Sequence, residues 1–255
     1  MWLRPFIIAI LAVALSSGIA FSQTLEKVRA RGHLVCASSH PLPGFAEQLD
    51  NGLWAGFDVD FCRAVATAVF GDPNLVQFRP LTGDARFAQL QTGELDLLVR
   101  DAAWNLSRDT GYRVRYVATS FFDGQGILVP QSLGAVSAYE LDGVKICVVD
   151  DSDELNRLRQ FFFENQASYT EVLYEDPADL AIAYKAGLCN AISARASLLH
   201  SIQIGMPDPG AQRIMPERIS KAPLGPVVRS DDDHWFNIVR RTHFAQIDDE
   251  EVAAT

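Results

Sequence analysis

The chain has 255 residues, a formal net charge of −10 at pH 7 and 48% hydrophobic residues. This length is sufficient for one large domain or for two lobes with substantial buried cores. Its acidic charge argues against electrostatic binding to nucleic acid or to an anionic membrane surface. The composition therefore indicates an acidic globular protein and excludes partners that need a basic surface.

The first 22 residues have the pattern of a secretory signal peptide. Arg4 supplies the positive charge, residues 5–15 form an apolar core, and Ala20-Phe21-Ser22 is a small-x-small cleavage site. The apolar run is shorter than the roughly 20 residues needed to span a bilayer, which argues against a membrane anchor. We predict export and cleavage after Ser22.

Behind this segment, the residue pattern predicts alternating helices and strands. In the first half we expect helices at residues 24–32, 58–70 and 86–91, and strands at residues 33–37, 76–81 and 95–99. The pattern restarts near residues 123–126. There we expect helices at 137–141, 154–165, 177–186 and 233–245, and strands at 144–149, 169–174, 191–193 and 223–228. Such alternation is typical of an α/β sheet with a mostly parallel core, and its restart predicts a second α/β unit.

The mature chain has four cysteines, Cys36, Cys62, Cys147 and Cys189. In an oxidising compartment an even number suggests two disulfides, with three possible pairings. A metal site is the alternative, but no Cys-x-x-Cys spacing supports it, and the five histidines are scattered. We predict structural disulfides and no metal or other cofactor.

Five segments follow one another behind the predicted signal peptide, at residues 56–66, 86–96, 107–109, 123–126 and 219–226. Together, in this order, they resemble the periplasmic amino-acid-binding proteins of ABC importers, in particular the general L-amino-acid receptors. The resemblance implies an α/β, two-lobed periplasmic binding protein-like fold of type II, whose lobes are joined by two crossover strands and close on a ligand.

The resemblance also implies a division of the chain. Residues 1–22 would be the signal peptide, residues 23–122 and 218–255 lobe I, and residues 123–217 lobe II. With this division we favour the pairs Cys36–Cys62 and Cys147–Cys189, because neither would cross the cleft between the lobes.

The same resemblance indicates where a ligand would bind. A receptor for an amino acid needs a guanidinium group with further donors for the carboxylate, and an acid for the ammonium group. Arg108 and its neighbour Ser107 match the family's carboxylate-binding position. Asn105 stands in a run where relatives carry small hydroxyl residues. Ser152 lies where lobe II offers donors at the start of a helix.

Arg195 departs from the family pattern, because relatives place there the aspartate that binds the ammonium group. In a closed cleft an arginine would repel that group by several kcal/mol even at an effective dielectric of about 20. The acidic turn at residues 150–153 adds charge that repels a carboxylate. Arg195 could pair with Asp151 or Asp153, could join Arg108 on a ligand with two acidic groups, or could point into solvent. We expect weak binding of ordinary α-amino acids.

These features predict a periplasmic solute-binding subunit of an ABC-type amino-acid importer, which takes a small polar or anionic solute and delivers it to an inner-membrane permease. The alternative is a degenerate binding protein that acts as a sensor or docking module. An enzyme is a third class, since some dehydratases use this fold. No acid/base residue can be assigned and no Gly-x-Ser-x-Gly elbow is present, so we expect no enzymatic activity.

Overall fold

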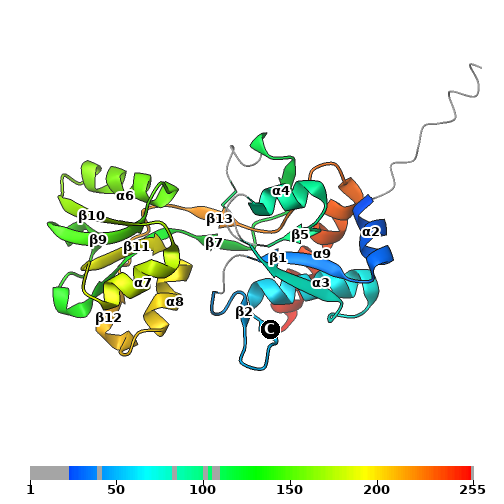
Figure 1. Cartoon of the computed structure of the whole chain (residues 1–255), viewed down its shortest axis with the longest axis horizontal. Coiled ribbons are helices and arrows are strands. Elements are labelled where there is room, and N and C mark those ends of the chain that lie inside the picture. Colours follow the sequence, from blue (N-terminus) through cyan, green and yellow to red (C-terminus); the bar gives the residue numbers. More distant parts are fainter. Residues whose placement is uncertain (1–22, 39–41, 82–84, 100–102, 105–109, 254–255) are drawn as a thin grey trace, which may run out of the picture.

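The computed structural model describes residues 23–38, 42–81, 85–99, 103–104 and 110–253. Two lobes, each built around a five-stranded sheet, are connected by a pair of strands (Figure 1). This confirms the predicted α/β two-lobed fold of type II. The expected signal peptide lies outside the described residues.

The first sheet has the strand order β4-β1-β5-β14-β6. Its strands are β1 (Leu34–Ser38), β4 (Val76–Pro80), β5 (Leu97–Leu98), β6 (Val114–Tyr116) and β14 (Val227–Arg229). β1 runs parallel to β4 and β5, whereas β14 is antiparallel to β5 and β6. The predicted parallel core is therefore present, and the last strand of the chain completes the sheet.

Helices cover both faces of this sheet. They are α2 (Gln23–Arg31), α3 (Phe57–Phe70), α4 (Ala85–Thr92) and α9 (Asp233–Ala253). Alternate residues of β1 belong to two different cores: Leu34 and Cys36 pack with α2, α3 and α9, while Val35 and Ala37 pack with α4. Because both faces are buried, β1 is apolar from Leu34 to Ala37, as is typical of strands in parallel sheets. A small hairpin, β2 (Glu47–Gln48) with β3 (Trp54–Ala55), precedes α3.

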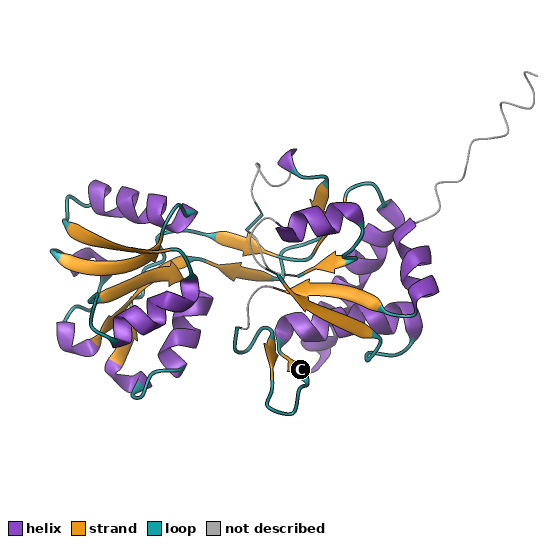
Figure 2. Ribbon diagram, in the orientation of Figure 1, coloured by secondary structure: helices purple, strands orange, loops and turns teal. Residues whose placement is uncertain are grey.

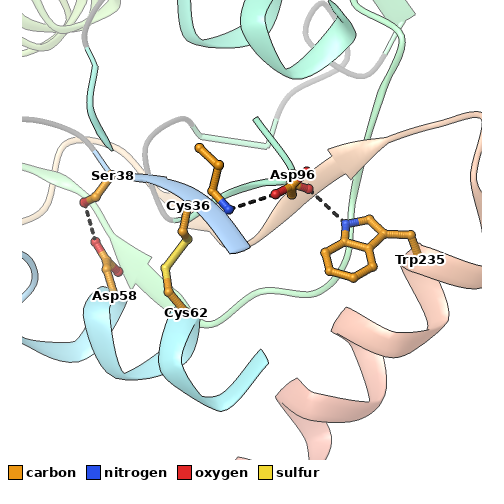
Figure 3. Close-up of a disulfide and its surroundings, with 7 residues drawn as sticks. Cys36, Ser38, Asp58, Cys62, Asp96 and Trp235 are labelled. Carbon is orange, nitrogen blue, oxygen red and sulfur yellow. Dashed lines mark hydrogen bonds between the residues drawn. A yellow bond between two sulfur atoms is a disulfide. The ribbon is translucent and has the colours of Figure 1, made fainter. Parts of the chain in front are cut away.

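Figure 3 shows how three parts of the first lobe are joined. The Cys36–Cys62 disulfide links β1 to α3. The indole Nε1 of Trp235, a fully buried residue of α9, donates to the carbonyl of Asp96 at 2.9 Å. The Asp96 carboxylate in turn accepts from the backbone N–H of Val35 at 2.8 Å. β1, the residues around β5 and α9 lie far apart in the sequence, and they thus pack in one core.

The second sheet has the order β10-β9-β11-β8-β12. Its strands are β8 (Gln125–Pro130), β9 (Val144–Val149), β10 (Tyr169–Tyr174), β11 (Ala191–Arg195) and β12 (Gln212–Ile214). β9 is parallel to β10 and β11, and β8 is antiparallel to β11 and β12. α6 (Asp153–Glu164) packs on one face, while α7 (Pro177–Lys185) and α8 (Ala196–Ile204) pack on the other (Figure 2). The Cys147–Cys189 disulfide lies in the second of these cores, so both disulfides are the pairs favoured above.

The connection between the lobes is the antiparallel pair β7 (Phe121–Asp123) and β13 (Ala222–Leu224). The single strand expected at residues 223–228 is thus divided in two: β13 pairs with β7, whereas β14 enters the first sheet. Gly225 lies at the break, and a Cβ there would come within 1.8 Å of the Ala118 carbonyl oxygen. The chain changes partners where only glycine fits.

The helix α8 was not predicted, and its N-terminus explains why. The residue before it is Arg195, which makes no side-chain cap. The cap is supplied instead by Asp123, whose Oδ1 accepts from the backbone N–H of Ser197 at 3.3 Å. Thr24, the first residue of the helix expected at residues 24–32, lies inside α2, and its N–H donates to Asp232 Oδ2 at 2.9 Å. Both caps come from residues far away in the chain, which local patterns do not reveal.

No helix in the described part of the chain is both long and apolar enough to cross a membrane.

Candidate functional site

The start of α6 is the lobe II position where ligand donors were expected. Ser152 is the N-cap: its hydroxyl accepts from the N–H of Leu155 at 3.1 Å and donates to the carbonyl of Val149 at 2.6 Å. Asp151, immediately before it, has a φ of 47°. The Ser152 hydroxyl is thus engaged in holding the helix end, which leaves the main-chain N–H groups of the first turn as the donors of this helix end.

Arg195 ends β11 and lies opposite Gln125 of β8. Its side chain is partly exposed. Within the described residues it forms no hydrogen bond or salt bridge, and neither Asp151 nor Asp153 pairs with it. The structure therefore does not contain the first of the alternatives considered for Arg195, an ion pair with Asp151 or Asp153. A guanidinium group without an acidic partner is a potential anion-binding group.

A buried polar network beneath these two positions was missed from the sequence. Gln125, which is almost fully buried, donates through Nε2 to the Glu154 carbonyl at 2.7 Å and to Ser193 Oγ at 2.9 Å. Ser193 Oγ donates to the carbonyl of Gly126 at 3.2 Å. The network ties the first turn of α6 to β8 and β11, and so fixes Ser152 relative to Arg195. The available signal was one polar residue among the otherwise nonpolar buried positions of each strand, Gln125 in β8 and Ser193 in β11.

On the lobe I side, Asn105, Ser107 and Arg108 lie outside the described residues. The segment leading to them is anchored at Trp104, whose N–H donates to the Pro223 carbonyl at 2.8 Å. The Trp104 ring stacks on Tyr116 with centroids 5.3 Å apart, and the residue is 40% exposed. Trp104, the last described residue before these positions, therefore lies beside the crossover strand β13.

A cavity of about 580 Å³ lies beside the crossover strands. We call it the hinge cavity. Its walls come from the segment before β2, from β7, from one face of α8 and from the segment before β13. In Figure 1, α8 lies on the side of the second lobe that faces the first lobe. Neither Ser152 nor Arg195 is among its lining residues, although Ala196, next to Arg195, is one of them.

Acidic, histidine and cysteine side chains do not gather into a possible metal site in the described ranges. All four cysteines are in disulfides.

The sequence of residues 34–255 matches the family of bacterial extracellular solute-binding proteins, family 3. The chain belongs to this family. The glutamate/glutamine/aspartate/asparagine-binding protein BztA of Rhodobacter capsulatus is 45% identical over 242 residues, which are 95% of this chain and 72% of BztA. The general L-amino acid-binding periplasmic protein AapJ of Rhizobium johnstonii is 42% identical over 247 residues, which are 97% of this chain and 72% of AapJ.

Solved structures agree with this assignment. An ABC transporter periplasmic binding protein from Brucella ovis with glutathione bound is 39% identical, with a TM-score of 0.84 over 90% of this chain and 72% of that one. An arginine-bound arginine-binding protein from T. maritima, at 19% identity and a TM-score of 0.70 over 87% of this chain and 99% of that one, supports the fold alone. The protein is therefore a periplasmic solute-binding protein, as the sequence analysis predicted.

Proposed function

We propose that this protein is the solute receptor of an ABC-type amino-acid importer and binds a small polar or anionic solute between its lobes. It hands this solute to an inner-membrane permease and catalyses no reaction. The observation that carries the proposal is the two-lobed family 3 architecture together with Arg195, which has no acidic partner in the described structure. BztA and AapJ, which are named as amino-acid-binding proteins, support the solute class.

We further propose the lobe limits given above, with the signal peptide at residues 1–22. Every strand of the first sheet falls within residues 23–122 or 218–255, and every strand of the second falls within residues 123–217. This distribution supports the division, since each proposed lobe then owns one complete sheet.

The favoured solute has two acidic groups, one for Arg108 and one for Arg195, with Asn105, Ser107 and the helix end at Ser152 as further polar contacts. Two arginines suit two carboxylates because each guanidinium can hold one in a bidentate pair. The glutathione bound by the Brucella ovis relative carries two carboxylates, which supports this solute class. An ion pair between Arg195 and Asp151 or Asp153 would have supported the alternative, a degenerate sensor. The described structure does not contain this pair, so no observation favours that alternative.

The test is a thermal-shift titration of the mature protein with neutral L-amino acids, dicarboxylic amino acids and glutathione. A ligand at 100 times its dissociation constant stabilises the folded protein by about 2.7 kcal/mol, so modest affinities register. We expect shifts with the diacids, little effect of neutral amino acids, and a loss of at least about tenfold in diacid affinity for Arg195→Ala.

The matched control is Arg157→Ala, which removes an exposed arginine of α6 for which the structure shows no partner among the described residues. It should leave the titrations unchanged. Strong stabilisation by several neutral amino acids, or full diacid affinity in Arg195→Ala, would contradict the proposed solute class.

A further inference from the structure

We propose that the hinge cavity is a second binding site, for a small carboxylate attached to an apolar or aromatic body. This site is separate from the one proposed around Arg108 and Arg195. Its volume, about 580 Å³, lies within the range of roughly 300–1,000 Å³ typical of small-molecule pockets.

Several of the residues that line the hinge cavity are large and apolar. Phe45 and Phe121 line it and meet edge to face, with ring centroids 5.1 Å apart. Phe122 and Ile204, which also line it, are 74% and 70% exposed. Large apolar side chains exposed together around a hollow mark a binding surface more often than isolated ones do. An apolar ligand body would remove their surface from water, which favours binding.

Another part of the lining is cationic. Arg218 and Lys221 lie on the segment before β13, and His200 lies on α8. In the described structure none of the three forms a salt bridge; Arg218 Nη1 donates only to the carbonyls of Met215 at 2.9 Å and Glu217 at 3.4 Å. Two permanent cations at one cavity, neither of them paired with an acid of the described residues, favour an anionic ligand group.

The acid among the described lining residues, Asp123, is already engaged. Its Oδ2 accepts from Ser197 Oγ at 2.5 Å, and its Oδ1 accepts from Gly124 N at 2.8 Å and from Ser197 N at 3.3 Å. Asp123 is buried and holds the start of α8. The exposed charge that a ligand meets is therefore that of Arg218 and Lys221.

The hinge cavity also joins the two lobes. Pro43 and Phe45 belong to the first lobe, whereas Ser197, His200 and Ile204 project from one face of α8 in the second, at helical spacing. A ligand there contacts both lobes at once. The ligand therefore favours the interlobe arrangement that forms this cavity, and disfavours arrangements in which the cavity walls move apart.

Isothermal titration with phenylacetate tests the site, because this probe has one carboxylate on an aromatic body and no ammonium group. Its neutral isostere phenylacetamide is the ligand control. We expect saturable binding of phenylacetate, at least tenfold weaker binding of phenylacetamide, and a loss of at least tenfold in the double variant Arg218→Ala/Lys221→Ala. Ile204→Asp, which places a negative charge on an exposed lining position, should weaken phenylacetate binding as well.

Two variants separate this site from the proposed solute site. Lys145→Ala, an exposed lysine of β9 away from the cavity, and Arg195→Ala should both keep phenylacetate affinity. The double variant should keep the response to diacids, so failure of one proposal leaves the other intact. The inference is overturned if phenylacetate gives no saturable heat up to about 10 mM, a limit set by the weakest affinities of interest. It is also overturned if phenylacetate binding is lost in Arg195→Ala but kept in the double variant.

Discussion

Ser197 Oγ donates a 2.5 Å hydrogen bond to Asp123 Oδ2, and so fastens the first turn of α8 to the crossover strand β7. The same carboxylate accepts from the N–H groups of Gly124 and Ser197. Both Asp123 and Ser197 are buried. The last residue of β7 is therefore fixed to the start of α8, at the point where the crossover enters the second lobe.

Asp123→Ala should lower the free energy of unfolding by about 1–3 kcal/mol, because it leaves buried donors without an acceptor. Asp123→Asn keeps one acceptor oxygen and should cost less. Urea denaturation followed by circular dichroism measures both. Combining Asp123→Ala with Ser197→Ala should cost less than the sum of the two single changes, since they remove one shared interaction. Strict additivity would show that the two side chains do not act together.

Gly225→Ala should lower the free energy of unfolding by about 1–3 kcal/mol or more, since overpacking usually costs this much. The added Cβ would lie 1.8 Å from the backbone oxygen of Ala118, and backbone cannot move aside as a flexible side chain can. Gly111→Ala is the matched control, because a Cβ added there would meet no atom within 4 Å beyond its own chain neighbours. Equal thermal unfolding midpoints for the two variants would refute this account of the chain break between β13 and β14.

Removing either disulfide should destabilise its own lobe. The bridged cysteines are separated by 26 and 42 residues, for which loop-closure entropy gives about 3.5 and 3.9 kcal/mol. We expect losses of this size for Cys36→Ala/Cys62→Ala and for Cys147→Ala/Cys189→Ala in urea denaturation. Tryptophan fluorescence should report the first variant more strongly, since Trp235 packs in the same core as Cys36 and Cys62. Unchanged stability of both variants would contradict a structural role for the disulfides.

Glu171 should make part of the stability depend on pH. Arg159 donates to both of its carboxylate oxygens, at 2.8 and 2.7 Å, and this pairing lowers the pKa of Glu171 below 4.5. The folded state therefore binds this proton less readily than the unfolded chain does. The contribution is present above pH 4.5 and is lost as the pH falls through the lowered value.

Glu171→Gln should consequently reduce the difference in urea midpoint between pH 7 and pH 3. Glu175→Gln, an exposed glutamate in the turn after β10, is the control and should leave that difference unchanged. If both variants keep the difference found in the unaltered protein, the pairing of Arg159 with Glu171 does not contribute.

Most elements of the fold could be predicted from the sequence. β9 and β10 have the predicted limits, and α3, α6 and α7 each begin or end within one residue of theirs. Local patterns suffice there because apolar spacing, glycine stops and capping residues act over a few positions. Ser152 was expected at a helix start, and it caps α6 through its own hydroxyl.

Contacts between distant residues decided the rest. Asp232 holds the N–H of Thr24 across 208 positions, and Asp123 caps α8 across 74, so neither helix start has a complete local signal. The sequence alone identified Arg195 as a departure from the family pattern. Only the tertiary structure showed that neither Asp151 nor Asp153 pairs with it, and that no other acid of the described residues does, because an ion pair depends on where side chains of separate elements point and not on their order in the chain.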